Sequence, residues 1–407
     1  MLLTIYLTLM LRKIPLVLTI FLMGLGFNSQ AQDDATIYAD AVRFMESDEF
    51  DLAVEAFGYI PDYRDSNYRS VISAMLSHKF RNTPLDKFLD FKGAPEAGDL
   101  FNYWLGRIQL KRFQLADAEV SFNAFLNDVQ YKEGFEDYKK EAHSKLTIIQ
   151  SASDKMVISP FESPINSKFA DLPGALLGNG ERLVFMSDRN SEGHFEIYKT
   201  DKGVYGWLAP EIISSTKIPA EVLNVLNVKE SLMFFDPDNK HLQTVELTDA
   251  GWNVNEDLDL PFLKDAHHIY MNRYSTRVIF SKEVDGKGLD LYESFKLRST
   301  GEWMEPTPIS GLVNSNFNED YPYMTDDRKR LYFSSNRPGG LGKADIYYVE
   351  IDPETNLWGK PINAGIPVNS VDDDISFSMT SEKVGLISSD RIHSTGDLDL
   401  FVVEVKD

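Results

Sequence analysis

Short apolar runs recur along the C-terminal two-thirds of the chain, and they predict strands. The clearest run is residues 330–337 (Arg-Leu-Tyr-Phe-Ser-Ser-Asn-Arg), which follows residues 320–322 (Asp-Tyr-Pro) and precedes residues 345–347 (Asp-Ile-Tyr) and Trp358. Runs of this length, rich in aromatic and β-branched residues and bounded by turn residues, are typical of buried strands. Related runs begin at residues 182, 277 and 384, and a degenerate run lies at 232–235.

The spacing of these runs predicts a β-propeller. Tryptophans stand at 207, 252, 303 and 358, so the steps between them are 45, 51 and 55 residues. A period of roughly 50 residues with several short strands in each unit is typical of propeller blades. Five inner runs predict five blades over residues 165–407, and a count of six stays open because the unit at about 212–260 is weak.

A Val/Ile-Asn-Ser phrase is expected to link each blade to the next. It occurs at residues 165–167, 313–315 and 368–370, and an acid follows each Asn by five residues, at Asp171, Glu319 and Asp374. A further outer strand is due after Phe401. We expect residues 155–159, within the linker 151–164, to supply it by pairing with the strand around 399–405. Such an exchange closes the ring and removes the open sheet edges.

Charged residues flank the hairpin that follows each inner run. Arg337 precedes the turn and Asp345 follows it, so an ion pair across the hairpin is the expected structural staple. The same pattern recurs as Arg189 with Glu196 and as Arg391 with Asp399.

Residues 32–150 show helical spacing instead. Phe50, Ala53 and Phe57 stand at offsets of 0, 3 and 7, and Leu115, Ala118 and Phe122 repeat those offsets. Such spacing puts the apolar residues on one helix face. The chain is therefore expected to be multidomain, with N-terminal helical hairpins before an all-β propeller. The aromatic residues Phe101, Tyr103 and Trp104 are interpreted as helix core, with a peptide-binding groove as the alternative.

Residues 1–31 are predicted to be a signal peptide. Arg12 and Lys13 precede an apolar stretch at 14–27, and Ser29-Gln30-Ala31 fits a cleavage site. Translation starts at Met1 or Met10. This leader predicts a periplasmic or secreted protein, and no transmembrane helix is expected in the mature chain.

Composition excludes several classes of chemistry. The chain has no Cys, so disulfides and thiol nucleophiles are excluded, and its formal net charge of −22 disfavours binding to nucleic acid. No Gly-x-Ser-x-Gly elbow is present, and the Gly-rich residues 338–342 are interpreted as a turn rather than a phosphate loop. His267 and His268 are adjacent, so on a strand they would face opposite sides and could not chelate one metal. From these observations the chain is predicted not to be an enzyme.

A set of acids stands just before the innermost strands, which converge on the axis of a propeller. The candidate channel-mouth residues are Asp171, Asp265, Asp320, Asp372, Asp373 and Asp374. One interpretation is a solvated rim of turn residues. The alternatives are a site for a cation, with Ca²⁺ as the candidate ion, or a surface for a basic segment of a partner. No other cofactor is expected.

The motif at 330–347 resembles the TolB-type, WD40-like propeller repeat, and Leu105 to Phe122 resembles a tetratricopeptide repeat. Together with the Val-Asn-Ser linkers, they resemble the N-terminal part of Bacteroidetes cell-envelope proteins. In those proteins an OmpA-like peptidoglycan-binding domain usually follows, and some belong to the type IX secretion machinery. We expect no such domain in this chain, and therefore no peptidoglycan binding.

This resemblance implies a non-enzymatic adaptor that binds other envelope proteins in the periplasm or, through them, at the outer membrane. The alternatives are a ligand- or cation-binding sensory module that uses the acidic channel mouth, and a glycan-active or hydrolytic propeller.

Overall fold

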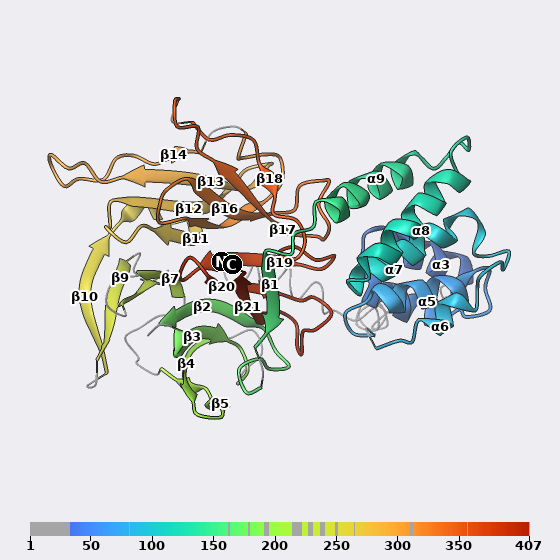
Figure 1. The fold of residues 1–407 in the computed structure, drawn as a ribbon, viewed down its shortest axis with the longest axis horizontal. Coiled ribbons are helices and arrows are strands. Elements are labelled where there is room, and N and C mark those ends of the chain that lie inside the picture. The colour runs from blue at the N-terminus through green and yellow to red at the C-terminus, as the bar shows by residue number, and fades with distance from the viewer. Residues whose placement is uncertain are drawn as a thin grey trace, which may run out of the picture. The chain divides into compact units, whose positions relative to one another are not determined.

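The computed structural model describes residues 33–406 apart from residues 81, 162, 178–179, 191–194, 214–221, 227–230, 237–240, 249–250, 264, 310–311 and 356. The predicted signal peptide therefore lies outside the described residues. The chain divides into two compact units, Met1–Leu146 and Thr147–Asp407. Figure 1 shows helices in the first part of the chain and strands in the second, which confirms the predicted fold class of N-terminal helices followed by an all-β propeller-like domain.

The first unit consists of helical hairpins. Its helices are α3 (Asp34–Glu46), α4 (Phe50–Gly58), α5 (Ser66–Leu76), α6 (Asp86–Leu89), η1 (Gly98–Leu100), α7 (Phe101–Lys111), α8 (Leu115–Asp128) and α9 (Glu136–Gln150). Helix α3 begins where the Asp33 carboxylate accepts the Thr36 N–H at 2.8 Å. None of the described helices has the length and apolar composition needed to cross a bilayer.

The predicted helix faces form the core of this unit. Ala53, Phe57, Ala118 and Phe122 are fully buried. Helices α7 and α8 approach closely because Gly106 has no side chain. A Cβ atom at this position would lie only 2.9 Å from the Phe122 ring. The cluster of Phe101, Tyr103 and Trp104 is also buried, as the core interpretation predicted.

The described strands of the second unit form five antiparallel sheets, one for each inner run of the sequence. We number the blades one to five by their innermost strands β2, β7, β11, β15 and β19. The strands are β2 (Asp171–Leu177), β3 (Arg182–Ser187), β4 (Glu196–Gly203), β5 (Gly206–Trp207) and β6 (Glu211–Ile212) in blade one; β7 (Val222–Leu226), β8 (Ser231–Asp236), β9 (His241–Thr248) and β10 (Gly251–Asp259) in blade two; β11 (Ala266–Met271), β12 (Arg277–Val284), β13 (Gly288–Phe295) and β14 (Thr307–Pro308) in blade three; β15 (Glu319–Met324), β16 (Arg330–Ser335), β17 (Asp345–Glu350) and β18 (Ile362–Asn363) in blade four; and β19 (Asp374–Met379), β20 (Val384–Ser389), β21 (Asp399–Val405) and β1 (Met156–Pro160) in blade five.

The five sheets form a closed ring. Strand β7 contacts β2 and β11, β15 contacts β11 and β19, and β20 and β21 contact β2. Strand β1 pairs with β21 in the register Met156↔Val405 to Pro160↔Phe401 (Figure 1). This is the exchange predicted from the sequence, shifted by one residue. The segment that precedes the first blade thus completes the last one, as the outermost of its four strands.

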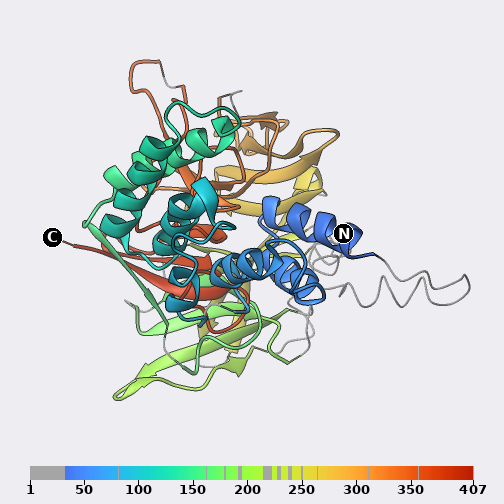
Figure 2. The same cartoon turned by 90° about the vertical axis from the view of Figure 1, so that its right-hand side faces the viewer.

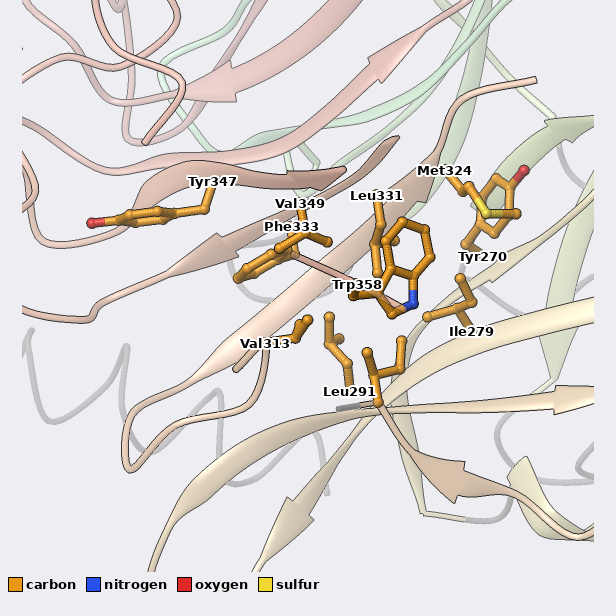
Figure 3. Packing of buried hydrophobic residues seen from close by; sticks show 11 residues of the cluster. Tyr270, Ile279, Leu291, Val313, Met324, Leu331, Phe333, Tyr347, Val349 and Trp358 are labelled. Atoms are coloured by element: carbon orange, nitrogen blue, oxygen red, sulfur yellow. The ribbon is translucent and has the colours of Figure 1, made fainter. Parts of the chain in front are cut away.

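Apolar side chains from neighbouring blades fill the space between the sheets. Figure 3 shows one such cluster, in which Tyr270, Ile279 and Leu291 of blade three meet Leu331 and Phe333 of blade four. The tryptophan that marks the repeat, Trp358, packs in this cluster and is 8% exposed. Burying each large apolar side chain contributes roughly 1.5–3 kcal/mol. The inner run and the tryptophan therefore recur because both form the contacts between blades.

Candidate functional site at the start of the innermost strands

An arginine in each of three blades pairs with an acid at the start of the innermost strand. In blade four, Arg337 Nη2 lies 3.0 Å from Glu319 Oε1. The guanidinium also donates to the Val313 carbonyl at 2.6 Å and to Ser335 Oγ at 3.1 Å. Blades one and five repeat this arrangement with the pairs Arg189–Asp171 and Arg391–Asp374. All three acids are fully buried, so these pairs belong to the fold of each blade.

The predicted pairing across the hairpin is therefore wrong. Arg337, Arg189 and Arg391 do not pair with Asp345, Glu196 and Asp399, respectively. Each guanidinium turns back toward the innermost strand instead, and Arg337 lies over the rings of Phe333 and Tyr347 at 5.2 and 5.1 Å. The physical reason is that the linker brings a carboxylate to the arginine, whereas the hairpin acids are already bonded within or beside their own turns.

The hairpin acids have a separate structural role. Asp345 accepts the Leu341 and Gly342 N–H groups at 2.7 and 2.8 Å and the Asn363 amide at 2.7 Å. Burial raises the pKa of Asp345 to about 6, and these hydrogen bonds oppose the rise. Asp399 accepts the Thr395 N–H at 2.5 Å, and burial raises its pKa to about 6 as well. Glu196 accepts from Asn190 and Tyr198.

The Asn-Ser linker explains why an acid follows the Asn by five residues. The side chain of Asn314 bonds both backbone groups of Leu291, accepting the N–H at 2.8 Å and donating to the carbonyl at 3.0 Å. Glu319 accepts the Ser315 N–H at 2.8 Å. The Asn thus binds the preceding blade, and the acid holds the linker at its own blade. The other linkers repeat this with Asn166 on Leu400 and Asn369 on Ile346.

The six predicted channel-mouth acids do not form one site. Asp171 and Asp374 are the buried partners of arginines described above. Asp373 is half-buried and accepts the Ala344 N–H at 3.0 Å, Asp372 is half-buried beside it, and Asp265 is exposed. Among the described residues, no group of three or more His, Asp or Glu side chains is arranged to hold a metal ion. Asp171 and Asp374 therefore recur because each blade uses them to bind its arginine.

Asp320 lies instead in a polar cluster between blades three and four. His268 Nδ1 lies 2.9 Å from Asp320 Oδ1, and Ser281 Oγ donates to the same oxygen at 2.5 Å. The His268 ring stacks on Tyr321, with centroids 3.6 Å apart. Tyr321 has a φ of 49°, a left-handed conformation that a bulky residue seldom adopts. We call His268, Ser281, Asp320 and Tyr321 the channel cluster.

Sequence reasoning missed His268 because it treated β11 as a regular strand. Register shifts interrupt β11 between Ala266 and Ile269 and β15 between Asp320 and Tyr323. A bulge redirects the side chains beside it, which places His268 against the carboxylate of the next blade. The sequence shows polar pairs at the starts of β11 and β15, His267-His268 and Glu319-Asp320. It does not show where the bulges in these strands lie.

The channel cluster can position an imidazole and a carboxylate. Burial alone would raise the pKa of Asp320, but His268, the Ser281 hydroxyl and the Tyr321 N–H together lower it below its ordinary value. Asp320 therefore stays ionised and orients the imidazole, as carboxylates do in many His-dependent sites. The neighbouring His267 is half-buried, and burial lowers its pKa.

At the other end of the innermost strands, the described residues enclose little space. A cavity of about 30 Å³ is lined by Tyr270, Tyr323, Met324 and Met379, among others. The Tyr323 hydroxyl donates to the Met379 carbonyl at 2.9 Å. A cavity of this size has room for one or two waters.

No protein-family model and no curated protein matches the chain. Several solved structures are similar to its propeller. An oligogalacturonate lyase in complex with manganese has 11% identity over 63% of this chain and 99% of its own, with a TM-score of 0.34. An α-L-arabinofuranosidase from Lactobacillus brevis has 11% identity over 60% and 92%, with a TM-score of 0.35. A post-proline cleaving enzyme from Rickettsia typhi has 10% identity over 55% and 33%, with a TM-score of 0.27.

These comparisons contradict the prediction that the chain is not an enzyme, because the similar solved structures are enzymes. At these identities and TM-scores, the likeness assigns neither a reaction nor a catalytic residue to this chain.

Proposed function

We propose that this chain is a protein-binding scaffold of the bacterial cell envelope. The observation that carries the proposal is the hairpin of β4 and β5. Its two-residue turn is Val204-Tyr205, whose side chains are 94% and 103% exposed, and Leu208 beside it is 56% exposed. We call these three residues the hairpin tip. Figures 1 and 2 show the hairpin extending past the rest of its sheet.

The composition of the turn supports a binding role. Two-residue hairpin turns favour Gly, Asn and Asp, and Val204 and Tyr205 are none of these. The base of the hairpin is well anchored, since Trp207 packs edge-on against Phe161 at 5.7 Å and the Lys202 N–H donates to the Glu181 carbonyl at 2.7 Å. An exposed aromatic side chain on a rigid support is typical of interface hot spots. The partner surface should therefore contain an apolar pocket that accepts Tyr205.

The location in the envelope rests on the predicted leader at residues 1–31 and on the resemblance to Bacteroidetes envelope proteins. Within that proposal, the partners are other envelope proteins, and a link to type IX secretion or envelope assembly follows from the same resemblance.

The double variant Val204→Ser, Tyr205→Ser tests the proposal. Both side chains are solvent-exposed, so the change should leave the unfolding midpoint unaltered while abolishing recovery of partner proteins from crosslinked envelope fractions. Tyr131→Ser is the matched control, because Tyr131 is 91% exposed in the helical unit. Equal recovery of the same proteins by the double variant and the wild type would refute the role of the hairpin.

A second candidate function is ligand binding at the channel cluster, favoured by the left-handed Tyr321 stacked on His268. Strained backbone of this kind concentrates at functional sites. Titration of the full chain with neutral sugars, read as the shift in melting temperature, tests it. The wild type should respond and Asp320→Asn should not; identical responses of the two proteins would remove this candidate.

A further inference from the structure

The contact between blades three and four contains a titratable pair that the hairpin proposal does not use. His268 lies on β11 and Asp320 on β15, and these two innermost strands contact each other. His268 Nδ1 lies 2.9 Å from Oδ1 and 3.0 Å from Oδ2 of Asp320. The two side chains are 23% and 14% exposed, so solvent screens their interaction only in part. We call His268 and Asp320 the interblade pair.

Hydrogen bonds from both blades hold the carboxylate against the imidazole. The His268 N–H donates to Ser281 Oγ at 3.1 Å, and Ser281 Oγ donates to Asp320 Oδ1 at 2.5 Å. The Tyr321 N–H donates to the same carboxylate oxygen at 2.8 Å. The Tyr321 ring stacks on the imidazole, with centroids 3.6 Å apart. The interblade pair is therefore held in place by both of the strands that it joins and by β12.

The contact between blades five and one shows what is particular to this pair. There Ser388 of β20 also reaches the innermost strand of the next blade, and its Oγ donates to the Asp171 carbonyl at 3.0 Å. A hydroxyl bonded to a backbone carbonyl carries no charge at any ordinary pH. Between blades three and four, Ser281 meets a carboxylate instead, and an imidazole lies beside it. This contact can therefore change with pH where the contact through Ser388 does not.

The other charged groups near the interblade pair act on the imidazole less directly than Asp320. Strand β7, which also contacts β11, has the sequence Val-Leu-Asn-Val-Leu and contains no titratable residue. Glu319 on β15 is bound to Arg337, and Lys282 on β12 lies over the Tyr292 ring at 4.3 Å. The other titratable residues beside the pair in sequence are half-buried His267 and the exposed acids Asp265 and Glu283. Solvent screens exposed charges strongly.

We propose that the interblade pair is a pH-sensitive contact that fastens blade three to blade four in mildly acidic solution and weakens as pH rises. Asp320 stays ionised, because His268, Ser281 and the Tyr321 N–H lower its pKa. The protonated imidazole adds charge attraction to its hydrogen bond with Asp320, whereas the neutral imidazole keeps only the hydrogen bond. The folded state therefore favours the proton, and the added stability is present below about pH 6.5 and is lost above it. This role is independent of both functions proposed above.

The first experiment follows the histidine side chains of the full chain by NMR, with labelled His and Tyr. The His268 resonance is assigned through the contact of its ring with Tyr321. His268 should titrate at a higher pH than the exposed His393, and Asp320→Asn should lower the His268 midpoint by about one pH unit while leaving His393 unchanged. An unchanged His268 midpoint in the variant would overturn the proposal. A wild-type midpoint at or below that of His393 would do so even if the variant failed to fold.

The second experiment asks whether the proton couples the two blades. Amide hydrogen exchange in β15 is compared between His268→Gln and the wild type at the same pH, so that intrinsic exchange rates cancel. The variant should exchange about tenfold faster than the wild type at about pH 5.5, and about threefold faster or less at about pH 8.5. His393→Gln is the matched control and should exchange like the wild type at both pH values. A ratio for His268→Gln that is the same at both pH values would overturn the proposal.

Discussion

Arg391 illustrates how one side chain organises a blade. It is 3% exposed, and its guanidinium binds Asp374, Ser389 Oγ at 3.0 Å and the carbonyls of Pro367 and Val368 at 3.1 and 2.7 Å. These groups belong to the linker, the innermost strand and the second strand. Because the pair is fully desolvated, removing one partner leaves an uncompensated buried charge, which is far more costly than losing a surface ion pair.

The first prediction follows from this burial. Asp374→Asn keeps the shape of the side chain but leaves Arg391 unpaired, so the propeller should lose about 3–5 kcal/mol of its free energy of unfolding. Glu350→Gln is the control, because the Arg330–Glu350 pair is half exposed and its loss should cost below about 1 kcal/mol. Urea unfolding followed by circular dichroism measures both. Equal losses of unfolding free energy in the two variants would show that the buried pair contributes no more to stability than the exposed pair.

The second prediction concerns pH. The pKa of Asp345 is raised by burial to about 6 in the folded protein, from 3.8 in its ordinary state. The folded state therefore binds this proton more tightly, and its contribution to stability rises as pH falls through 6 toward 4. Between pH 7 and pH 5 the wild type should gain about 1 kcal/mol relative to Asp345→Asn. A difference between the two proteins that stays constant over this range would contradict the raised pKa.

At the scale of elements, strand β1 decides whether the ring is closed. It lies more than 200 residues from its partner β21 in sequence, yet it completes the same sheet. Met156 and Ile158 on β1 pack against the core of blade five. Closure therefore couples the first and last segments of the propeller in one cooperative structure.

The third prediction uses the absence of Cys to test this pairing. Val157 lies opposite Glu404 in the ladder, so Val157→Cys with Glu404→Cys should form an intramolecular disulfide under mild oxidation. Because it closes a very long loop, the disulfide should raise the free energy of unfolding in urea by about 2–4 kcal/mol, and reductant should reverse the gain. Failure to oxidise, or oxidation only between molecules, would contradict the closing strand.

The sequence predicted the helices and strands better than it predicted which side chains pair with each other. The inner runs, the closing strand and the helix face with Gly106 followed from periodicity, because burial imposes a regular spacing on a chain. The pairing of Arg337 did not follow, since Asp345 and Glu319 are both acids within reach of the same strand, and only the backbone of the linker decides between them. His268 was missed because β11 was treated as a regular strand, whereas a register shift interrupts the innermost strand of every blade.

At the scale of the whole molecule, the polar groups that recur from blade to blade, the buried arginine–acid pairs and the linker asparagines, stabilise the fold. Among the described large apolar side chains of the propeller, Val204 and Tyr205 of the hairpin tip are the most exposed. The formal charge of −22 adds to this picture, since it favours neutral or basic partner surfaces and repels anionic ones.

The most direct measurement is site-specific photocrosslinking from the hairpin tip in living cells. A photoreactive phenylalanine analogue in place of Tyr205 should crosslink the chain to a discrete envelope protein, identified by mass spectrometry, because this side chain is expected to lie in a pocket of the partner. The same analogue at Tyr131, which is also almost fully exposed, should give no such product. Crosslinks that are absent at position 205, or that are the same at both positions, would contradict the proposal that the propeller binds its partner through this hairpin.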